Sequence, residues 1–311
     1  MAVSMNSIVA NPSKVFRRRT DSTSMSALMT SGIAAQDHVL SKMDKLPPFS
    51  PVLSKLMATL ADEDVSFVEL ASLIEKDTVL SGNVLKLVNS AYYGRSGTVN
   101  SIRHAVSIIG MARIRNMVLS LSISKTWSSM KLPRNWSSGR FNLHSVAVGI
   151  MADLLASNLP VPYSEGAFVG GLLHDIGKLL IAIAAPAEYE TVAKRIEAGM
   201  APVASEAEIL GFSHPAISAA LLERWKIPKP IQRAVAMHHS PDEADSRQMH
   251  LAHVINAADE FVNAAGYTVA NVPQPEESDP AKALEKLDLR AHLPMVIETF
   301  QADFDAIKSF F

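Results

Sequence analysis

The strongest constraint on this chain is an apolar segment, residues 170–180, that carries a histidine, a carboxylate and a lysine. In Gly-Gly-Leu-Leu-His-Asp-Ile-Gly-Lys-Leu-Leu, His174, Asp175 and Lys178 stand where a buried helix normally has leucine. A buried charge is costly unless it is paired or binds a metal. The segment therefore predicts an apolar helical run at the centre of a metal site, whose other ligands must come from elsewhere in the chain.

The composition limits the kind of metal site that the chain can build. None of the 311 residues is cysteine, which excludes thiolate ligands, disulfides and a thiol nucleophile. The ligands must then be histidines and carboxylates, a set that suits Mn, Fe, Zn, Ni or Mg. The net charge of −2, from 29 basic and 31 acidic residues, gives no overall attraction to nucleic acid or to an anionic membrane. We therefore do not expect nucleic acid to be the main partner.

The longest apolar stretch, residues 167–185, is a poor candidate for a membrane span because the same three polar residues interrupt it. The N-terminal residues lack the basic-then-apolar order of a signal peptide. We expect a cytoplasmic protein without membrane insertion.

Helix signals follow one another through most of the chain, and no alternating strand pattern occurs. The pattern predicts an all-α fold with two packed helical subdomains. We expect a flexible tail at residues 1–34, a first helical subdomain at 35–130 and a second, metal-binding one at 139–270. A surface loop and C-terminal helices follow at 271–311, and a polar junction containing Pro and Gly separates the two subdomains.

Capping signals predict several helix boundaries in the first subdomain. Pro51 can open a helix in its first turn, and residues 66–69 (Ser-Phe-Val-Glu) form a capping-box pattern. Asp77 and Ser101 are suited to cap the next helices, and Gly110 is suited to end one.

The second subdomain offers a candidate metal ligand on each of several predicted helices. One ligand per helix, pointing into the core, is how helical bundles build metal sites. The neighbours His238 and His239 cannot share one face of a regular helix, but Ser240-Pro241 supplies a break there. The candidate ligands are His144, His174, Asp175, His214, His238, His239 and Asp259. An ordinary polar role is an equal alternative for His144, and His214 and Asp259 could instead be a helix-start residue and a surface acid.

These residues resemble the HD superfamily of metal-dependent phosphohydrolases. His144, His174-Asp175 and Asp259 match its order of a histidine, a His-Asp pair and a later aspartate. The HD-GYP branch, whose members are cyclic di-GMP phosphodiesterases, adds a histidine and a His-His pair, which His214 and His238-His239 match. The resemblance implies one or two divalent ions, a bridging role for Asp175 and a phosphate contact for Lys178. Residues 240–243, Ser-Pro-Asp-Glu, do not match the Gly-Tyr-Pro segment of that branch.

The first half resembles the HDOD domain, an all-helical, HD-related output module of bacterial signal transduction. The resemblance extends over about residues 36–265. It rests on four dispersed motifs: residues 46–49 (Leu-Pro-Pro-Phe), 74–77 (Ile-Glu-Lys-Asp), 87–93 (Leu-Val-Asn-Ser-Ala-Tyr-Tyr) and 105–110 (Ala-Val-Ser-Ile-Ile-Gly). It implies a regulatory rather than a catalytic role for the protein.

Two functional hypotheses follow. In the first, the chain is a regulatory module that senses a metal or a nucleotide-like or phosphoester ligand and contacts signalling proteins. In the second, a dinuclear His/Asp centre makes the chain a phosphohydrolase or cyclic-nucleotide phosphodiesterase, with Asp175 bridging the ions and Lys178 neutralising charge. We favour the regulatory module, because a resemblance of fold does not establish activity.

Overall fold

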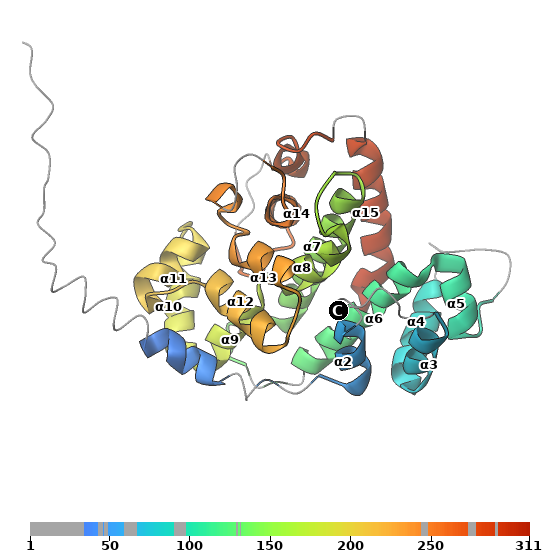
Figure 1. Ribbon diagram of the computed structural model, residues 1–311. Helices are drawn as coiled ribbons and strands as arrows, with labels where there is room; N and C mark the ends of the chain where they lie inside the picture. The colour runs from blue at the N-terminus through green and yellow to red at the C-terminus, as the bar shows by residue number, and fades with distance from the viewer. Residues whose placement is uncertain are drawn as a thin grey trace, which may run out of the picture.

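The computed structural model describes residues 34–42, 46, 49–58, 67–89, 98–128, 130, 132–243, 248–272, 278–289 and 292–311. All regular secondary structure in these residues is helical, so the predicted all-α class is confirmed. The predicted tail at residues 1–34 lies almost wholly outside the described residues. Figure 1 shows α3, α4 and α5 gathered to one side of a larger group of helices.

A helix over residues 34–41 comes first, and the helices of the first half that follow it are α2 (Pro51–Ala58), α3 (Phe67–Glu75), α4 (Thr78–Val88), α5 (Ile102–Ile109) and α6 (Met111–Ser128). Those of the second half are α7 (Ser138–Ser157), α8 (Ala167–Leu173), α9 (Ile176–Ala184), α10 (Pro186–Glu197), α11 (Pro202–Leu210), α12 (His214–Arg224), α13 (Lys229–Ala236), α14 (Leu251–Ala264) and α15 (Leu293–Ile307). Short 3₁₀ turns are η2 (Ser164–Gly166), η3 (Pro241–Glu243), η4 (Pro280–Leu284) and η5 (Lys308–Phe310).

Side-chain caps set the helix starts in the first half as predicted. The Asp77 carboxylate accepts hydrogen bonds from the backbone N–H groups of Val79 and Leu80 at 3.1 and 3.0 Å. The Ser101 hydroxyl accepts one from the backbone of His104 at 3.2 Å, and the helix that it caps ends at Gly110. The predicted cap at Ser66 lies outside the described residues.

Helix α6 joins the two halves of the chain. It packs against α2, α3, α4 and α5 on one side and against α7 and α8 on the other. Ile114, Val118 and Leu119 are fully buried along it. A change in the position of α7 can therefore reach the first half through direct packing.

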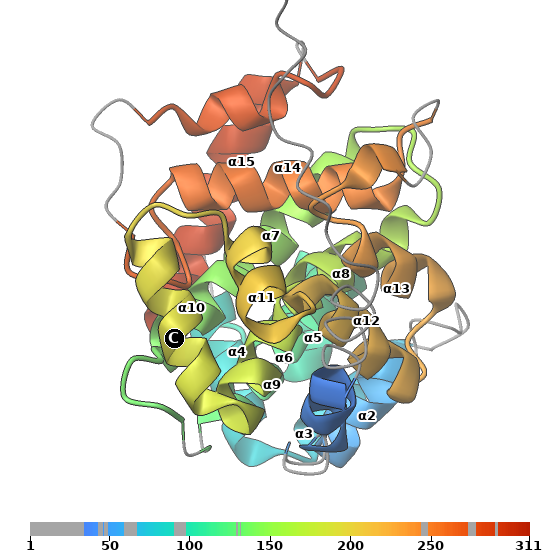
Figure 2. The same cartoon turned by 90° about the vertical axis from the view of Figure 1, so that its left-hand side faces the viewer.

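The second half is built around α7, α8 and α14, which pack against one another. Helix α15 covers α7, and a ring contact of 5.2 Å between Phe261 and Phe300 joins α14 to α15. Figure 2 shows α10 and α11 beside each other on the side of the molecule that faces the viewer. Buried apolar side chains on all of these helices form one continuous core.

The apolar run of residues 170–180 is not one continuous helix, contrary to the sequence-based expectation. Helix α8 ends at Leu173 and α9 begins at Ile176, with a turn at His174 and Asp175. Neighbouring side chains of a regular helix point about 100° apart, and the turn lets both side chains face the same centre. Among the described helices, one stretch, Ser164–Ala184, is long and apolar enough to cross a membrane, and 83% of it is buried inside the protein.

Gly177 allows α9 and α12 to approach closely. A Cβ atom at this position would collide with the carbonyl oxygen of His214 and lie 2.9 Å from the backbone nitrogen of Ser218. The Ser218 hydroxyl accepts a hydrogen bond from the Gly177 N–H at 2.8 Å. The glycine therefore holds the start of α12, and with it the His214 ring, against the turn that carries Asp175.

We expect Gly177→Ala to lower the free energy of unfolding by about 1–3 kcal/mol, the usual result of overpacking a core. Urea unfolding followed by circular dichroism measures the change. The matched control is Gly82→Ala on α4, where nothing lies within 4 Å of the added Cβ. That variant should be neutral or slightly more stable, because alanine favours helix. Equal behaviour of the two variants would contradict this explanation of Gly177.

Candidate metal centre

The structure brings all seven predicted ligands together in the second half of the chain. Their candidate ligand atoms form two groups, each within 4.8 Å: one contains His144, His174 and Asp259, and the other contains Asp175, His214, His238 and His239. Apart from His239, all of these residues are buried. They come from α7, α12, α14, the turn between α8 and α9, and the segment after α13.

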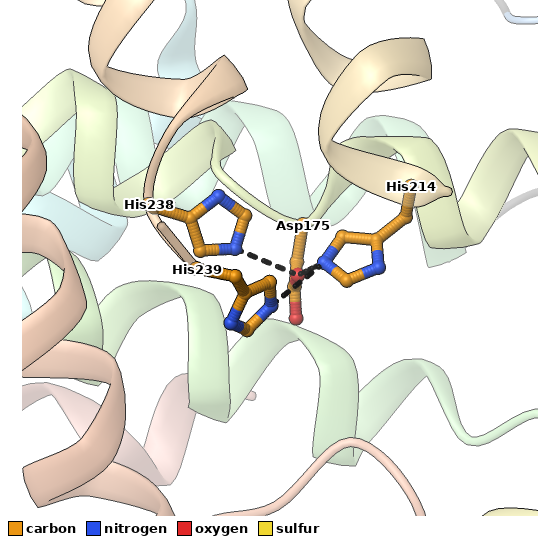
Figure 3. Close-up of side chains that lie close together, drawn as sticks. All are labelled: Asp175, His214, His238 and His239. Carbon is orange, nitrogen blue, oxygen red and sulfur yellow. Dashed lines mark hydrogen bonds and ion pairs between the residues drawn. The ribbon is translucent and has the colours of Figure 1, made fainter. Parts of the chain in front are cut away.

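Asp175 lies between the two groups and faces each with a different oxygen. Its Oδ2 is 3.5 Å from His144 Nε2 and 3.4 Å from His174 Nε2. Its Oδ1 is 3.0 Å from His214 Nε2 and 4.0 Å from His238 Nε2 (Figure 3). This arrangement suits a carboxylate that bridges two cations, which is the role expected for Asp175.

The end of α13 explains how adjacent histidines can serve one site. The helix ends at Ala236, and His238 and His239 follow in a turn, before the Ser240-Pro241 break. Figure 3 shows both rings directed toward Asp175 from this one segment, opposite His214. The predicted break in helical geometry is present, and it begins earlier than Ser240.

Hydrogen bonds fix the orientation of three of the histidine rings. Each has its Nδ1 2.7 Å from a backbone carbonyl oxygen: His144 from Tyr267, His174 from Gly171 and His238 from Val235. A carbonyl oxygen only accepts, so Nδ1 carries the proton in each ring and Nε2 presents a lone pair to the centre. Metal-binding histidines are commonly oriented in this way.

Two residues that orient the ligands were not predicted from the sequence. The buried Glu206 carboxylate accepts hydrogen bonds from His214 Nδ1 at 2.7 Å and from the His214 backbone N–H at 2.8 Å. Asn263, one helical turn after Asp259, donates to its carboxylate at 2.7 Å. The spacing of Asn263 from Asp259 was a usable signal, whereas Glu206 lies on another helix and looks like an ordinary acid.

Two pairs of histidine nitrogens face each other in the centre. His144 Nε2 and His174 Nε2 are 3.3 Å apart, and His214 Nε2 and His239 Nε2 are 3.2 Å apart. Since Nδ1 holds the proton in both His144 and His174, neutral rings would place two lone pairs of the first pair against each other. A proton or a cation shared by these two nitrogens removes this repulsion.

The first group binds protons when no metal is present. Burial opposes charge on His144 and His174, but the carboxylates of Asp175 and Asp259 outweigh it and raise both pKa values, that of His174 to about 10. Burial likewise opposes ionisation of Asp175, yet the nearby charges of His174, Lys178 and His214 hold its pKa well below the usual range. A divalent cation would replace these protons, since metal ligation requires neutral histidine.

Two histidines of the second group resist protonation. Burial, aided by neighbouring histidines, holds the pKa of His238 well below its usual value, and partial loss of hydration lowers the pKa of the more exposed His239 to about 4. Asp175 Oδ1 and His238 Nε2 are also buried without a hydrogen-bond partner among the described residues, and the 3.0 Å contact of Oδ1 with His214 lacks hydrogen-bond geometry. Unsatisfied buried acceptors that face one another fit a cation-binding site.

We expect Glu206→Gln to weaken metal binding at the second group by about 10- to 100-fold, the usual effect of losing a charged partner behind a histidine ligand. Glutamine keeps the shape and an acceptor oxygen, so the fold should persist. Titration with Mn²⁺ measures the affinity. Glu208→Gln on the same helix is the matched control, because Glu208 is exposed and pairs with Arg195. A loss of equal size in both variants would contradict the assignment.

A cavity of about 580 Å³ opens beside the centre, and His239, Asp259 and Lys178 lie in its wall. Lys178 Nζ is 2.6 Å from Asp175 Oδ2, and its side chain is 17% exposed. A ligand in the cavity would therefore meet both the ligand cluster and one ammonium group. This is the setting that the phosphate contact predicted for Lys178 requires.

The chain belongs to the HDOD family. The HDOD domain matches residues 46–241, which include helices α2 to α13 and all the candidate ligands except Asp259. The N-terminal motifs and six of the seven candidate ligands are therefore parts of one family domain. This confirms the resemblance found in the sequence.

Three solved structures share the fold. An HDOD domain protein of unknown function from Geobacter sulfurreducens is 22% identical, with a TM-score of 0.74 over 92% of this chain and 99% of that one. A protein of Shewanella amazonensis SB2B, provisionally named a phosphohydrolase, is 24% identical, with a TM-score of 0.70 over 88% and 98%. A protein of Marinobacter aquaeolei VT8, provisionally named a signal transduction protein, is 18% identical, with a TM-score of 0.69 over 91% and 66%.

A curated relative is longer than this chain. It is an uncharacterized protein of Treponema pallidum (strain Nichols), 24% identical over 278 residues that make up 86% of this chain. The match covers 51% of the relative, so the chain spans about half its length.

Proposed function

We propose that the chain is a metal-dependent signalling module. In this proposal a dinuclear centre on Asp175 binds an oxyanion ligand, and the ligand-bound state is read by a protein partner. The main support for this proposal is that the two oxygens of Asp175 face two separate sets of histidines beside an open cavity. HDOD membership and the similarity of the fold to a provisionally named signal transduction protein support the regulatory part.

The donor set limits which ions would bind. His144, His174, Asp175 and Asp259 would hold one ion, and Asp175, His214, His238 and His239 the other. Imidazole and carboxylate ligands suit Mn, Fe, Zn, Ni or Mg, with Mg the least favoured by so many nitrogens. Divalent ions at this position supply Lewis acidity to a phosphoryl oxygen.

The surrounding residues would position the ligand and transmit its binding. Lys178 places an ammonium group at the boundary between centre and cavity, where it can neutralise an anionic head group. His144 lies on α7, which packs against α6, and α6 in turn packs against the helices of the first half. Small movements of α7 would therefore alter the surface that the first half presents to a partner.

Hydrolysis of a phosphoester is the second candidate function. Two observations favour it. The candidate ligands suffice for two ions, and Lys178, which can stabilise developing negative charge, lies beside Asp175. The similarity of the fold to a provisionally named phosphohydrolase agrees with this candidate.

One experiment separates the two functions. Protein loaded with Mn²⁺ or Fe²⁺ is tested for phosphate binding by calorimetry and for turnover of bis(p-nitrophenyl) phosphate and cyclic di-GMP. Phosphate binding without turnover, together with altered hydrogen exchange in α6, supports the signalling module. Turnover that His174→Ala abolishes supports the enzyme. Failure to bind Mn, Fe, Ni or Zn at stoichiometric concentration contradicts both.

A further inference from the structure

The cavity beside the centre has an apolar body and a polar end. Its walls come from α9, α10, α11 and α14, together with the turn between α10 and α11, the turn after α13 and the segment after α14. Six aliphatic or thioether side chains make up much of its lining: Ile181, Val192, Ile196, Met200, Val269 and Val272. Met200 is 46% exposed and lies beside Gly199 in the turn between α10 and α11, which places an apolar side chain at the edge of the cavity. A volume of about 580 Å³ lies within the usual range for small-molecule sites.

The charged groups of the cavity all lie at its inner end and already have partners. Lys178 pairs with Asp175 at 2.6 Å, Glu206 accepts from His214 at 2.7 Å, and Asp259 lies 3.2 Å from His144. No arginine lines the described part of the cavity. One anionic group can therefore be neutralised at the metal centre, and no charged side chain remains for a second anion further out.

Three uncharged polar side chains of the lining are turned toward the protein itself. Asn263 donates to Asp259 at 2.7 Å, the Thr268 hydroxyl donates to the Ala270 carbonyl at 2.7 Å, and the Ser278 hydroxyl donates to the Ala264 carbonyl at 2.9 Å. Recognition of a nucleobase normally uses free donors and acceptors together with stacking rings. Apart from the His239 imidazole at the metal centre, Tyr189 supplies the one aromatic ring among the described lining residues.

We propose that the ligand of this site is an amphiphile. Its phosphate-type head group binds at the dinuclear centre beside Lys178, and its uncharged aliphatic body fills the cavity between α10 and the segment after α14. This inference rests on the proposed function, because the centre must bind the head group. It excludes nucleotides and cyclic dinucleotides as the preferred ligands of the site.

The test uses Mn²⁺-loaded protein and a series of probes: inorganic phosphate, methyl phosphate, butyl phosphate and hexyl phosphate. Calorimetry measures each dissociation constant, with AMP and cyclic di-GMP as competitors of different shape. Each buried methylene contributes about 0.8 kcal/mol, so affinity should rise by up to about fourfold per added carbon. Hexyl phosphate should therefore bind far more tightly than methyl phosphate and more tightly than either nucleotide.

Two matched variants locate the effect in the cavity. Ile196→Asn places an amide in the apolar wall and should remove most of the gain with chain length, while the affinity for inorganic phosphate stays the same. Ile209→Asn is the control, since Ile209 is similarly half-buried on the adjoining α11 but does not line the cavity. Ile196→Phe fills the cavity without adding a polar group and should weaken the binding of hexyl phosphate alone. This variant keeps the test valid if Ile196→Asn fails to fold.

Three outcomes would overturn the inference. Equal affinity for methyl and hexyl phosphate contradicts the proposal that the ligand body is apolar, and so does tighter binding of AMP or cyclic di-GMP. In either case, if inorganic phosphate still binds, the proposed function is not contradicted. Loss of the chain-length effect in Ile209→Asn as well as in Ile196→Asn contradicts the location. Failure of the loaded protein to bind any phosphate, inorganic phosphate included, refutes the proposed function and the inference with it.

Discussion

Asp175→Ala is expected to remove both metal ions from the protein at once. Each carboxylate oxygen faces one set of histidines, so the single change takes a ligand from both ions. It also removes the negative charge nearest to four histidines and Lys178, which leaves two cations without a bridging anion between them. We expect the metal affinity of both ion sites to fall by more than about 100-fold. This is more than the usual effect of losing a residue that only hydrogen-bonds to a metal ligand.

The prediction is most specific in how many metal ions each variant should lose. Plasma mass spectrometry after dialysis should find two ions in the native protein and almost none in Asp175→Ala. His144→Ala and His239→Ala should each affect mainly one ion, because each belongs to one group. Asp153→Asn is the control, a half-buried acid on α7 that accepts a hydrogen bond from Asn116 outside the centre. Retention of one ion by Asp175→Ala would show that the two groups do not share this carboxylate.

Removal of the metals is expected to lower the melting temperature by roughly 5–10 °C. A ligand present at 100 times its dissociation constant stabilises the folded state by about 2.7 kcal/mol, and a domain of this size shifts by about 2–4 °C per kcal/mol. The physical cause is that the folded state alone assembles the ligands, and cations also relieve the repulsion between His144 Nε2 and His174 Nε2 at 3.3 Å. Scanning calorimetry with and without EDTA measures the difference.

The control for this prediction is Asp175→Ala, which should melt at the same temperature with and without EDTA. Readdition of Mn²⁺ should restore the melting temperature of the native protein and leave that of the variant unchanged. A similar response to EDTA in both proteins would mean that the stabilising metal binds elsewhere.

Much of the site could be predicted because its ligands are chemically conspicuous in their surroundings. A His-Asp pair in a leucine-rich run, such as His174-Asp175, has few structural explanations. The adjacent His238 and His239 required a helix end, which the following proline indicated. Helical periodicity and caps at Asp77 and Ser101 likewise made the all-α class predictable. Whether the seven residues bind metal stays a prediction.

The remaining features depend on contacts between segments far apart in the chain. Glu206 gains its role only because α11 lies beside the start of α12, and no local pattern marks it. The turn at His174 and Asp175 follows from packing, since the sequence itself favours an unbroken helix there. The cavity is lined from several segments far apart in the chain, so its apolar character cannot be read from any one of them. Local patterns predict elements and ligands, whereas tertiary packing sets their orientation.

Anomalous diffraction from crystals grown with Mn²⁺ would show directly whether Asp175 bridges two ions. We expect two anomalous peaks, one on each side of the Asp175 carboxylate, with His144, His174 and Asp259 around the first and His214, His238 and His239 around the second. A single peak that leaves one oxygen of Asp175 without a cation, or peaks only elsewhere in the protein, would contradict the dinuclear centre.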